Sequence, residues 1–190
     1  MLVATVVISQ RTRVEGVPQG GAVVSSGETT ARAVRAPQVP TPRGGPASGP
    51  AAGEIPSDEH LDVSANVPAV TNLDPALRQA LGAAETVMRS NGIQLWITSG
   101  WRTTAYQQRL YDEAVAQHGV EYARTHVATP DKTEHTKGEA VDIAPTAADK
   151  WLILHGAQFG LCQTYANEIW HFELTAKDGQ CPAMRTDALG

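Results

Sequence analysis

Between residues 74 and 92, the apolar positions recur at the spacing of an amphipathic helix. The apolar residues lie three and four positions apart and so share one helix face: Leu77, Ala80, Leu81, Ala84, Val87 and Met88. Asp74 is followed by Pro75, a typical helix start in which the aspartate caps the helix and the proline takes its first position. Asn91 and Gly92 end the run. The pattern predicts one long helix with a buried face.

Two further helices are predicted later in the chain. The first runs from Thr104 to about His118, where Gly119 ends it, and Thr104 and Gln107 have the spacing of a capping box. The second covers residues 146–155, and its inward-facing residues are expected to be Trp151, Leu152 and Leu154.

Three short stretches have the alternation or composition of strands, namely residues 94–99, 139–144 and 168–174. Side chains alternate along a strand, so Asp142 lies on a face of small residues while the opposite face carries Val141 and Ile143. Helices and strands follow one another in mixed order with short connections. This order predicts an α+β fold with a small, largely antiparallel sheet flanked by helices.

Composition divides the chain near residue 56. Residues 1–56 hold seven of the 12 prolines and many glycines, alanines and serines, which predicts a flexible, disordered tail. All four tryptophans lie beyond residue 90, so the folded domain is expected over residues 57–190. From Pro56 onward, 10 Lys and Arg face 17 Asp and Glu. An acidic domain argues against nucleic acid as the partner, because binding phosphates needs a basic surface.

Two features bear on the compartment in which the protein works. The N-terminal tip is apolar from Leu2 to Ile8, too short to span a bilayer, and is either a truncated export signal or an apolar tip without function. Cys162 and Cys181 are the two cysteines. They suit a single disulfide in an exported protein, and two buried free thiols are the alternative.

The segment TEHTKGEAVDIAP (133–145) carries the first candidate chemistry. His135 and Asp142 lie seven residues apart, and Gly138 between them would let the chain turn back and bring the two side chains together. Taken alone, the segment is better explained by a surface histidine and a solvated aspartate.

A third residue changes that interpretation. His171 lies in EIWHFEL (168–174) between two bulky apolar residues, where a hydrogen-bonded core histidine is the common alternative. Together, however, His135, Asp142 and His171 supply two imidazoles and one carboxylate, a ligand set suited to Zn²⁺ with a fourth position open to water. Glu168 is then a candidate general base. In a regular strand it would face away from His171, so a turn or bulge near Asn167 is required.

Three segments resemble the motifs of VanY-type D-alanyl-D-alanine carboxypeptidases, zinc peptidases of the bacterial cell wall related to the VanX D,D-dipeptidases. They are SGWRTTAYQ (99–107), TEHTKGEAVD (133–142) and EIWH (168–171). The second matches the family pattern S-x-H-x-x-G-x-A-x-D, except that Thr133 replaces the usual serine. The resemblance covers roughly residues 70–175 and implies the fold of the Hedgehog and D,D-peptidase group.

Carried over residue by residue, the resemblance implies a role for each matched position. His135, Asp142 and His171 would bind zinc, and Glu168 would be the catalytic base. The remaining positions would act on substrate: Arg102 by stabilising the oxyanion, Gln107 and Thr133 by contacting the terminal D-residue, and Ser99 by lining the cleft. Two of these have structural alternatives, since Gln107 could only cap its helix and Ser99 could only support the turn that follows it.

The resemblance also implies the reaction. The expected activity is zinc-dependent removal of the terminal D-alanine from peptidoglycan stem peptides ending in D-Ala-D-Ala. The protein is expected to be an exported monomer, in the cell envelope or outside the cell, and tethered to the membrane if the apolar tip is a truncated signal or anchor. A D,D-dipeptidase or a peptidoglycan endopeptidase would use the same metal chemistry and stays open. A wall-binding module with a structural zinc is the non-enzymatic alternative, and the presence of both Glu168 and Arg102 argues against it.

Overall fold

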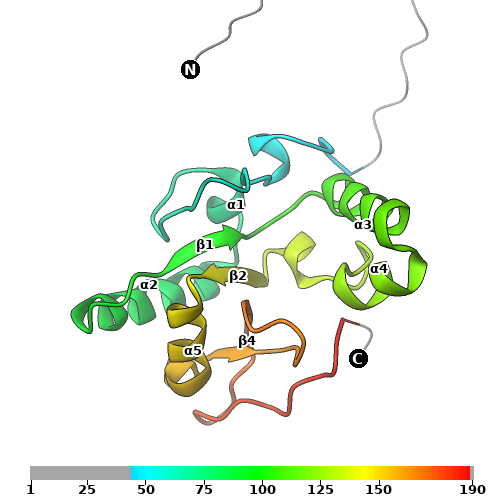
Figure 1. Ribbon diagram of the computed structural model, residues 1–190. Coiled ribbons are helices and arrows are strands. Elements are labelled where there is room, and N and C mark those ends of the chain that lie inside the picture. The colour runs from blue at the N-terminus through cyan, green and yellow to red at the C-terminus, as the bar shows by residue number, and fades with distance from the viewer. Residues whose placement is uncertain (1–43, 189–190) are drawn as a thin grey trace, which may run out of the picture. The chain divides into compact units, whose positions relative to one another are not determined.

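A four-stranded antiparallel sheet lies at the centre of the computed structural model, which describes residues 44–188 (Figure 1). Its strand order is β1-β2-β4-β3, and every neighbouring pair is antiparallel. The strands are β1 (Trp96–Ser99), β2 (Ala140–Ala144), β3 (Leu161–Gln163) and β4 (His171–Leu174). Because helices accompany a small antiparallel sheet, the predicted α+β class is confirmed.

Five α-helices and three 3₁₀ turns make up the rest of the regular structure in residues 44–188. The helices are α1 (Pro68–Thr71), α2 (Pro75–Ser90), α3 (Thr104–His118), α4 (Val120–His126) and α5 (Thr146–His155). The 3₁₀ turns are η1 (Pro50–Ala52), η2 (Glu134–Lys137) and η3 (Gly156–Phe159). Over the described residues, none of these helices has both the length and the apolar character needed to cross a bilayer.

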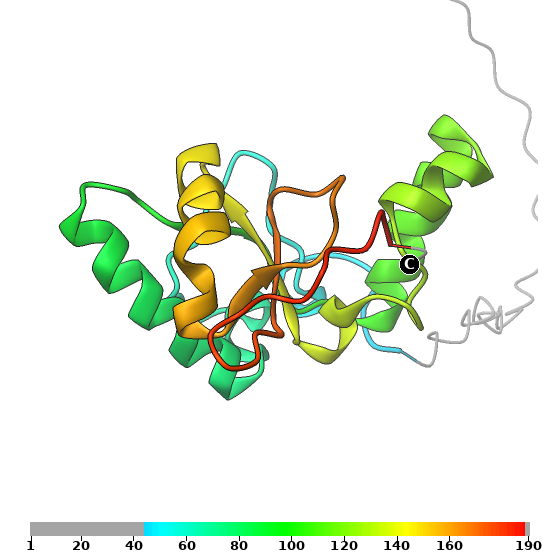
Figure 2. The same cartoon turned by 90° about the horizontal axis from the view of Figure 1, so that it is seen from below.

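The hydrophobic core lies between the sheet and the helices α2 and α5. The buried face of α2 is the predicted one, apart from Val87, which is 39% exposed. Val141 and Ile143 meet it from β2, as the alternation in the sequence predicts, and Phe172 meets it from β4. Figure 2 shows α2 and α5 beside the sheet, with the α3–α4 pair at the opposite end of the molecule. The other face of the sheet is therefore free to carry polar residues.

Helix α3 has the predicted range but a different cap. The side chain of Thr103, not that of Thr104, accepts the hydrogen bond from a first-turn backbone N–H, that of Tyr106, at 3.0 Å. The capping box predicted for Thr104 and Gln107 is therefore wrong, because the helix begins at Thr104, one residue earlier than that pattern requires. Gln107 is buried and its side chain is directed to other partners.

The structure differs from the sequence-based predictions in the buried face of α5 and the start of the last strand, and it contains two elements that were not predicted. In α5, Leu152 is buried as predicted, but Leu154 is 74% exposed because the buried face of this helix runs through Ala148 instead. The last predicted strand begins at His171 rather than at residue 168. Strand β3 and helix α4 carry too few residues to show a period, and neither was predicted.

Part of the segment assigned to the tail packs on the domain. Residues 44–56 include η1 and the fully buried Ala52, whose carbonyl accepts a hydrogen bond from the Thr103 backbone at 2.9 Å. Arg109 of α3 forms an ion pair with Glu54 at 2.7 Å and donates to the carbonyl of Ala47 at 2.8 Å. The folded part of the chain thus begins before residue 57, and the rest of the tail predicted over residues 1–56, namely residues 1–43, lies outside the described residues.

The two cysteines are joined in the structure. Cys162 in β3 and Cys181 form a disulfide with a Cα–Cα distance of 5.5 Å. The bond closes a loop that contains the EIWH segment and all of β4. It also fixes the start of the C-terminal segment, residues 181–188, against the edge strand of the sheet.

Candidate functional site

Three polar residues form a row across the sheet. The register pairs Ser99 of β1 with Asp142 of β2, and Asp142 with His171 of β4. Residues directly opposite each other in paired strands point to the same face. Because Val141 and Phe172 fill the core on the other side, this row is on the face away from the core. Strand pairing alone thus brings Asp142 and His171 together over 29 residues of sequence.

His135 reaches the same place from the 3₁₀ turn η2, which leads into β2. The segment from residue 133 to 145 is therefore a tight turn followed by a strand. Gly138 makes the reversal possible, because its φ of +78° is strained for residues with a Cβ and its Cα lies close against the carbonyl of Asn72. The predicted meeting of His135 with Asp142 follows from this turn.

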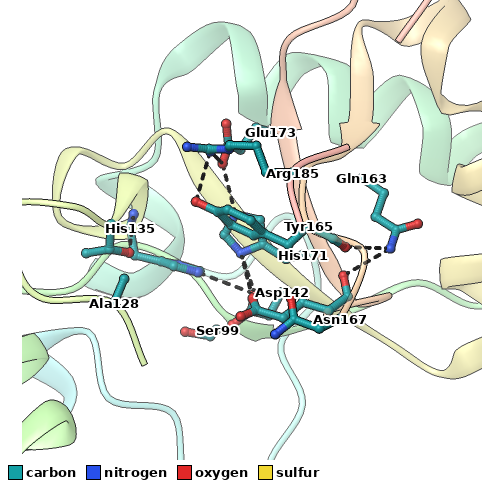
Figure 3. A network of polar contacts seen from close by, with 12 residues as sticks. Ser99, Ala128, His135, Asp142, Gln163, Tyr165, Asn167, His171, Glu173 and Arg185 are labelled. Carbon is teal, nitrogen blue, oxygen red and sulfur yellow. Dashed lines mark hydrogen bonds and ion pairs between the residues drawn. The ribbon is translucent and has the colours of Figure 1, made fainter. Parts of the chain in front are cut away.

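The two histidine rings converge on one carboxylate oxygen of Asp142 (Figure 3). Asp142 Oδ1 lies 3.3 Å from His135 Nε2 and 3.2 Å from His171 Nδ1. The other nitrogen of each ring faces an oxygen that accepts its proton, the Gly100 carbonyl at 2.8 Å from His135 Nδ1 and Glu173 Oε1 at 3.1 Å from His171 Nε2. Each ring is thereby oriented with one nitrogen toward the centre, as metal-binding histidines usually are.

Burial and charge shift the pKa values of all three groups. Burial lowers the pKa of His135, and the nearby Arg102 guanidinium lowers it further. Burial opposes the charge of Asp142, but the two imidazoles outweigh it and hold the pKa of that carboxyl well below its usual range. Burial likewise opposes the charge of His171, while hydrogen bonds to Asp142 and Glu173 raise its pKa to about 9. The Asp142 carboxyl is thus held in its ionised form at neutral pH.

Glu168 approaches this centre from outside the sheet. Backbone hydrogen bonds from Glu168 N to Tyr165 O and from His171 N to Glu168 O fold residues 165–171 into consecutive turns. This is the turn near Asn167 that the sequence required, and it brings Glu168 Oε2 to 3.7 Å from His171 Nδ1. Burial raises the pKa of the Glu168 carboxyl. A carboxylate with a raised pKa is better suited to exchange protons near neutral pH.

Three acceptors hold Arg102 beside Asp142. Its guanidinium donates to Ser99 Oγ at 2.9 Å, to Gln107 Oε1 at 2.9 Å and to Asp142 Oδ2 at 3.2 Å. Gln107 in turn donates to the carbonyl of Ala128 at 2.7 Å, which fixes its orientation. Ser99 and Gln107 therefore orient Arg102, and Ser99 is not among the residues that line the cavity described next.

A cavity of about 170 Å³ opens over the centre. Of the residues expected to act on substrate, Arg102, Gln107 and Thr133 line it together with Glu168. Thr133 is buried, and its hydroxyl accepts from the backbone N–H of His135 at 3.2 Å. The wall also includes residues that the sequence did not indicate, among them His126, Tyr165 and Ala188. They lie on α4, on the turns before β4 and near the C-terminus, outside the three motifs.

Comparison with known proteins identifies the family. Residues 71–177 match the model of the VanY D-alanyl-D-alanine carboxypeptidase family. This chain belongs to the VanY family. A D-alanyl-D-alanine carboxypeptidase of Enterococcus faecalis is 30% identical over 126 residues, which are 53% of this chain and 46% of that protein. The chain thus spans about half the length of that relative.

Solved structures of VanY proteins have the same fold. A mutant of the vancomycin-resistance D,D-pentapeptidase VanY in complex with Zn(II) superposes with a TM-score of 0.52 at 27% identity, over 63% of this chain and 82% of that one. VanYB in complex with D-alanine-D-alanine gives a TM-score of 0.51 at 28% identity, over 53% and 70% of the two chains. The LD-carboxypeptidase LdcB, 20% identical, shares the fold with a TM-score of 0.54 over 70% and 72%.

The donor atoms of this VanY-family site fit a zinc ion. Ligand atoms about 2.0–2.2 Å from a tetrahedral ion lie about 3.4 Å from one another. Asp142 Oδ1 is 3.3 and 3.2 Å from the two histidine nitrogens, and all three donor atoms lie within 4.8 Å of one another. Two imidazoles and one carboxylate are also the donor types of catalytic zinc sites that keep a fourth position for water.

Proposed function

We propose that this protein is a zinc-dependent D,D-carboxypeptidase that removes the terminal D-alanine from peptidoglycan stem peptides. The observation that carries the proposal is the convergence of His135, Asp142 and His171 on one point, with Glu168 and Arg102 on the same cavity wall. A metal with a purely structural role needs no adjacent acid and no adjacent cation. Family membership and the zinc complex of a related VanY protein support the same conclusion.

His135, Asp142 and His171 would hold the zinc ion. When bound in such a site, zinc supplies Lewis-acid chemistry that makes water a nucleophile near neutral pH and polarises a carbonyl. The chain orients its ligands in advance, because the Gly100 carbonyl and Glu173 fix the two imidazole rings. Such oriented ligands and dipoles need little rearrangement during the reaction.

Glu168 would move the proton. Its carboxylate lies on the cavity wall beside the ligand His171, and burial raises its pKa. In the ionised form it would accept a proton from the attacking water, and the resulting acid would pass that proton to the departing D-alanine amine. Positioned general bases of this kind contribute typically 10²–10⁴-fold to the rate.

Arg102 would stabilise the negative charge that develops on the scissile carbonyl oxygen. Its guanidinium is fixed by Ser99, Gln107 and Asp142, so it does not have to be ordered when substrate binds. One oxyanion partner is commonly worth about 10²–10³ in turnover.

The cavity suits the end of a peptide. At about 170 Å³ it is smaller than the roughly 300–1,000 Å³ of pockets that enclose a whole drug-sized ligand. Thr133 and Gln107 lie on its wall, where a small terminal D-residue would sit. The VanYB complex with D-alanine-D-alanine supports this choice of substrate.

We further propose that the protein works outside the cytoplasm. The Cys162–Cys181 disulfide supports this location, because disulfides persist mainly in oxidising compartments. Peptidoglycan lies in the same compartment.

A product analysis by mass spectrometry tests the proposed reaction. The zinc-loaded protein is incubated separately with a stem pentapeptide ending in D-Ala-D-Ala and with free D-Ala-D-Ala. We expect the pentapeptide to give the tetrapeptide and free D-alanine, and the dipeptide to be hydrolysed much more slowly. Faster cleavage of the dipeptide would make the protein a D,D-dipeptidase, and cleavage inside the stem would make it an endopeptidase.

A further inference from the structure

The C-terminal segment, residues 181–188, lies beyond the part of the chain that matches the family model, yet it borders the site. The disulfide at Cys181 holds its start against β3. Further along, Arg185 N donates to the carbonyl of Thr164 at 2.9 Å, and Ala166 N donates to the carbonyl of Arg185 at 2.8 Å. Ala188, at its end, is buried and lines the cavity. The segment is thus attached along its length to the turns that precede His171.

The side chain of Arg185 contacts two residues at once (Figure 3). Its guanidinium lies 4.6 Å over the ring of Tyr165, and its Nη2 donates to the hydroxyl of the same tyrosine at 2.9 Å. The same nitrogen is 3.6 Å from Glu173 Oε1. The planar guanidinium of an arginine can stack on an aromatic ring and at the same time donate hydrogen bonds from its own edge to nearby oxygens. A lysine ammonium group cannot reproduce this.

Both of these residues contact the metal-site histidine. Glu173 Oε1 accepts the hydrogen bond from His171 Nε2 at 3.1 Å, and the Tyr165 ring lies 4.9 Å from the His171 ring between centroids. Glu173 is 6% exposed, so its carboxylate is costly unless a cation compensates it. When His171 serves as a neutral metal ligand, Arg185 still places a positive charge beside this carboxylate.

We propose that Arg185 is a positioning residue for the zinc ligand His171, acting through Glu173 and Tyr165. The C-terminal segment is accordingly part of the metal site, although none of its side chains binds the metal. The proposal rests on the proposed function insofar as His171 is a zinc ligand. Partners that orient a ligating histidine typically change metal affinity by 10–100-fold. Since Arg185 acts one contact further out, we expect its loss to weaken zinc binding by about 3–10-fold.

The test measures zinc affinity directly, by competition with a chromophoric chelator, on the metal-free full-length protein. Arg185→Ala should bind zinc about 3–10-fold more weakly than wild type, and Arg185→Lys, which keeps the charge but not the fork, should fall between them. The melting temperature of the metal-free variants should stay close to wild type. At saturating zinc, KM for the pentapeptide should be unchanged, which separates positioning of the metal from binding of substrate.

Two matched control variants separate this effect from a general loss of zinc affinity. Met184→Ala alters the same segment at an exposed side chain, and Arg89→Ala removes an exposed arginine that pairs with Glu85 on α2. Both should bind zinc as wild type does. In a Tyr165→Phe/Glu173→Gln background, Arg185→Ala should have less than a twofold effect, because the tyrosine hydroxyl and the carboxylate charge with which Arg185 interacts are already removed.

Several results would overturn the inference. They are unchanged zinc affinity in Arg185→Ala, an equal loss in either control, or a full loss that persists in the Tyr165→Phe/Glu173→Gln background. A wild-type protein that binds no zinc would instead refute the proposed function together with it. A wild type that binds zinc but releases no D-alanine would refute the proposed reaction and leave the affinity comparison intact.

Discussion

At the scale of single residues, the two histidines of the site are oriented by very different partners. His135 donates to the Gly100 carbonyl, a neutral group fixed by the backbone after β1. His171 donates to Glu173, a buried carboxylate whose charge needs compensation. The orientation of His135 is thus secured by the fold itself, whereas that of His171 depends on surrounding side chains.

Arg102 offers a test of substrate activation apart from metal binding. Arg102→Ala should keep its zinc, because the three ligands stay in place, while kcat falls by about 10²–10³-fold. Arg102→Lys keeps the positive charge but not the planar guanidinium, so its kcat should lie between those of wild type and Arg102→Ala. Metal analysis and steady-state kinetics on the same samples check this. Loss of zinc from Arg102→Ala would show that the arginine mainly holds Asp142.

Asp149 gives a prediction about stability and pH. Burial and the charge of Asp142 raise its pKa to about 6, and no hydrogen-bond partner for its Oδ1 is found within the described part of the chain. The folded state therefore binds more protons than the unfolded state between about pH 4 and pH 6, so this aspartate lowers stability as pH rises through that window.

Asp149→Asn removes the titration. The free energy of unfolding of this variant minus that of wild type should increase by about 1–2 kcal/mol when the pH rises from 4 to 7. Urea denaturation at both pH values measures the difference, and Asp58→Asn, at an exposed position, controls for the loss of a charge. If the stability of Asp149→Asn relative to wild type instead falls as the pH rises, the raised pKa of Asp149 in the folded state is contradicted.

At the scale of elements, the pairing of β2 with β4 creates the site by placing Asp142 opposite His171. The sequence predicted these strands and the long helix α2, because alternation and helical spacing extend over enough residues to be recognised. It also singled out His135, Asp142, His171 and Glu168, which the structure brings together, since their motifs are local. Tyr165 and Arg185 gave no such signal. Their positions depend on turns and on the disulfide, which no periodic pattern encodes.

The disulfide should matter for stability because it closes the loop that contains β4. In the chain-entropy model, a loop of this length stabilises the folded state by about 3 kcal/mol. Cys162→Ser/Cys181→Ser should therefore unfold at a clearly lower denaturant concentration than the oxidised wild type. Wild type kept under reductant is the control and should behave like the double variant. Equal stability of all three samples would mean that the bond does not constrain the unfolded chain.

At the scale of the whole molecule, the domain extends beyond the residues that match the VanY family on both sides. Residues 44–56 contact the start of α3 at Thr103, next to Arg102, and residues 181–188 contact the turns before His171. Both additions thus meet the family domain beside residues of the site. The low sequence complexity of the first segment concealed this, because its contacts are made largely by backbone carbonyls.

Two truncations separate the packed part of the N-terminal region from the rest. Deleting residues 1–43 should leave the melting temperature and activity close to wild type, because that composition has no core-forming pattern. Deleting residues 1–56 should lower the melting temperature by several degrees, since it removes the contacts to Thr103 and Arg109. Equal melting temperatures of the two truncations would show that residues 44–56 add no stability.

The most direct test of the central claim is the rate of D-alanine release from a pentapeptide by zinc-loaded Glu168→Gln beside wild type. The glutamine keeps the size of the side chain but cannot accept the proton. We expect equal zinc content and a turnover lower by about 10²–10⁴-fold. Glu121→Gln, at an exposed position on α4, should release D-alanine at the wild-type rate. Full activity of Glu168→Gln, or a wild type that binds zinc yet forms no tetrapeptide, would contradict the account.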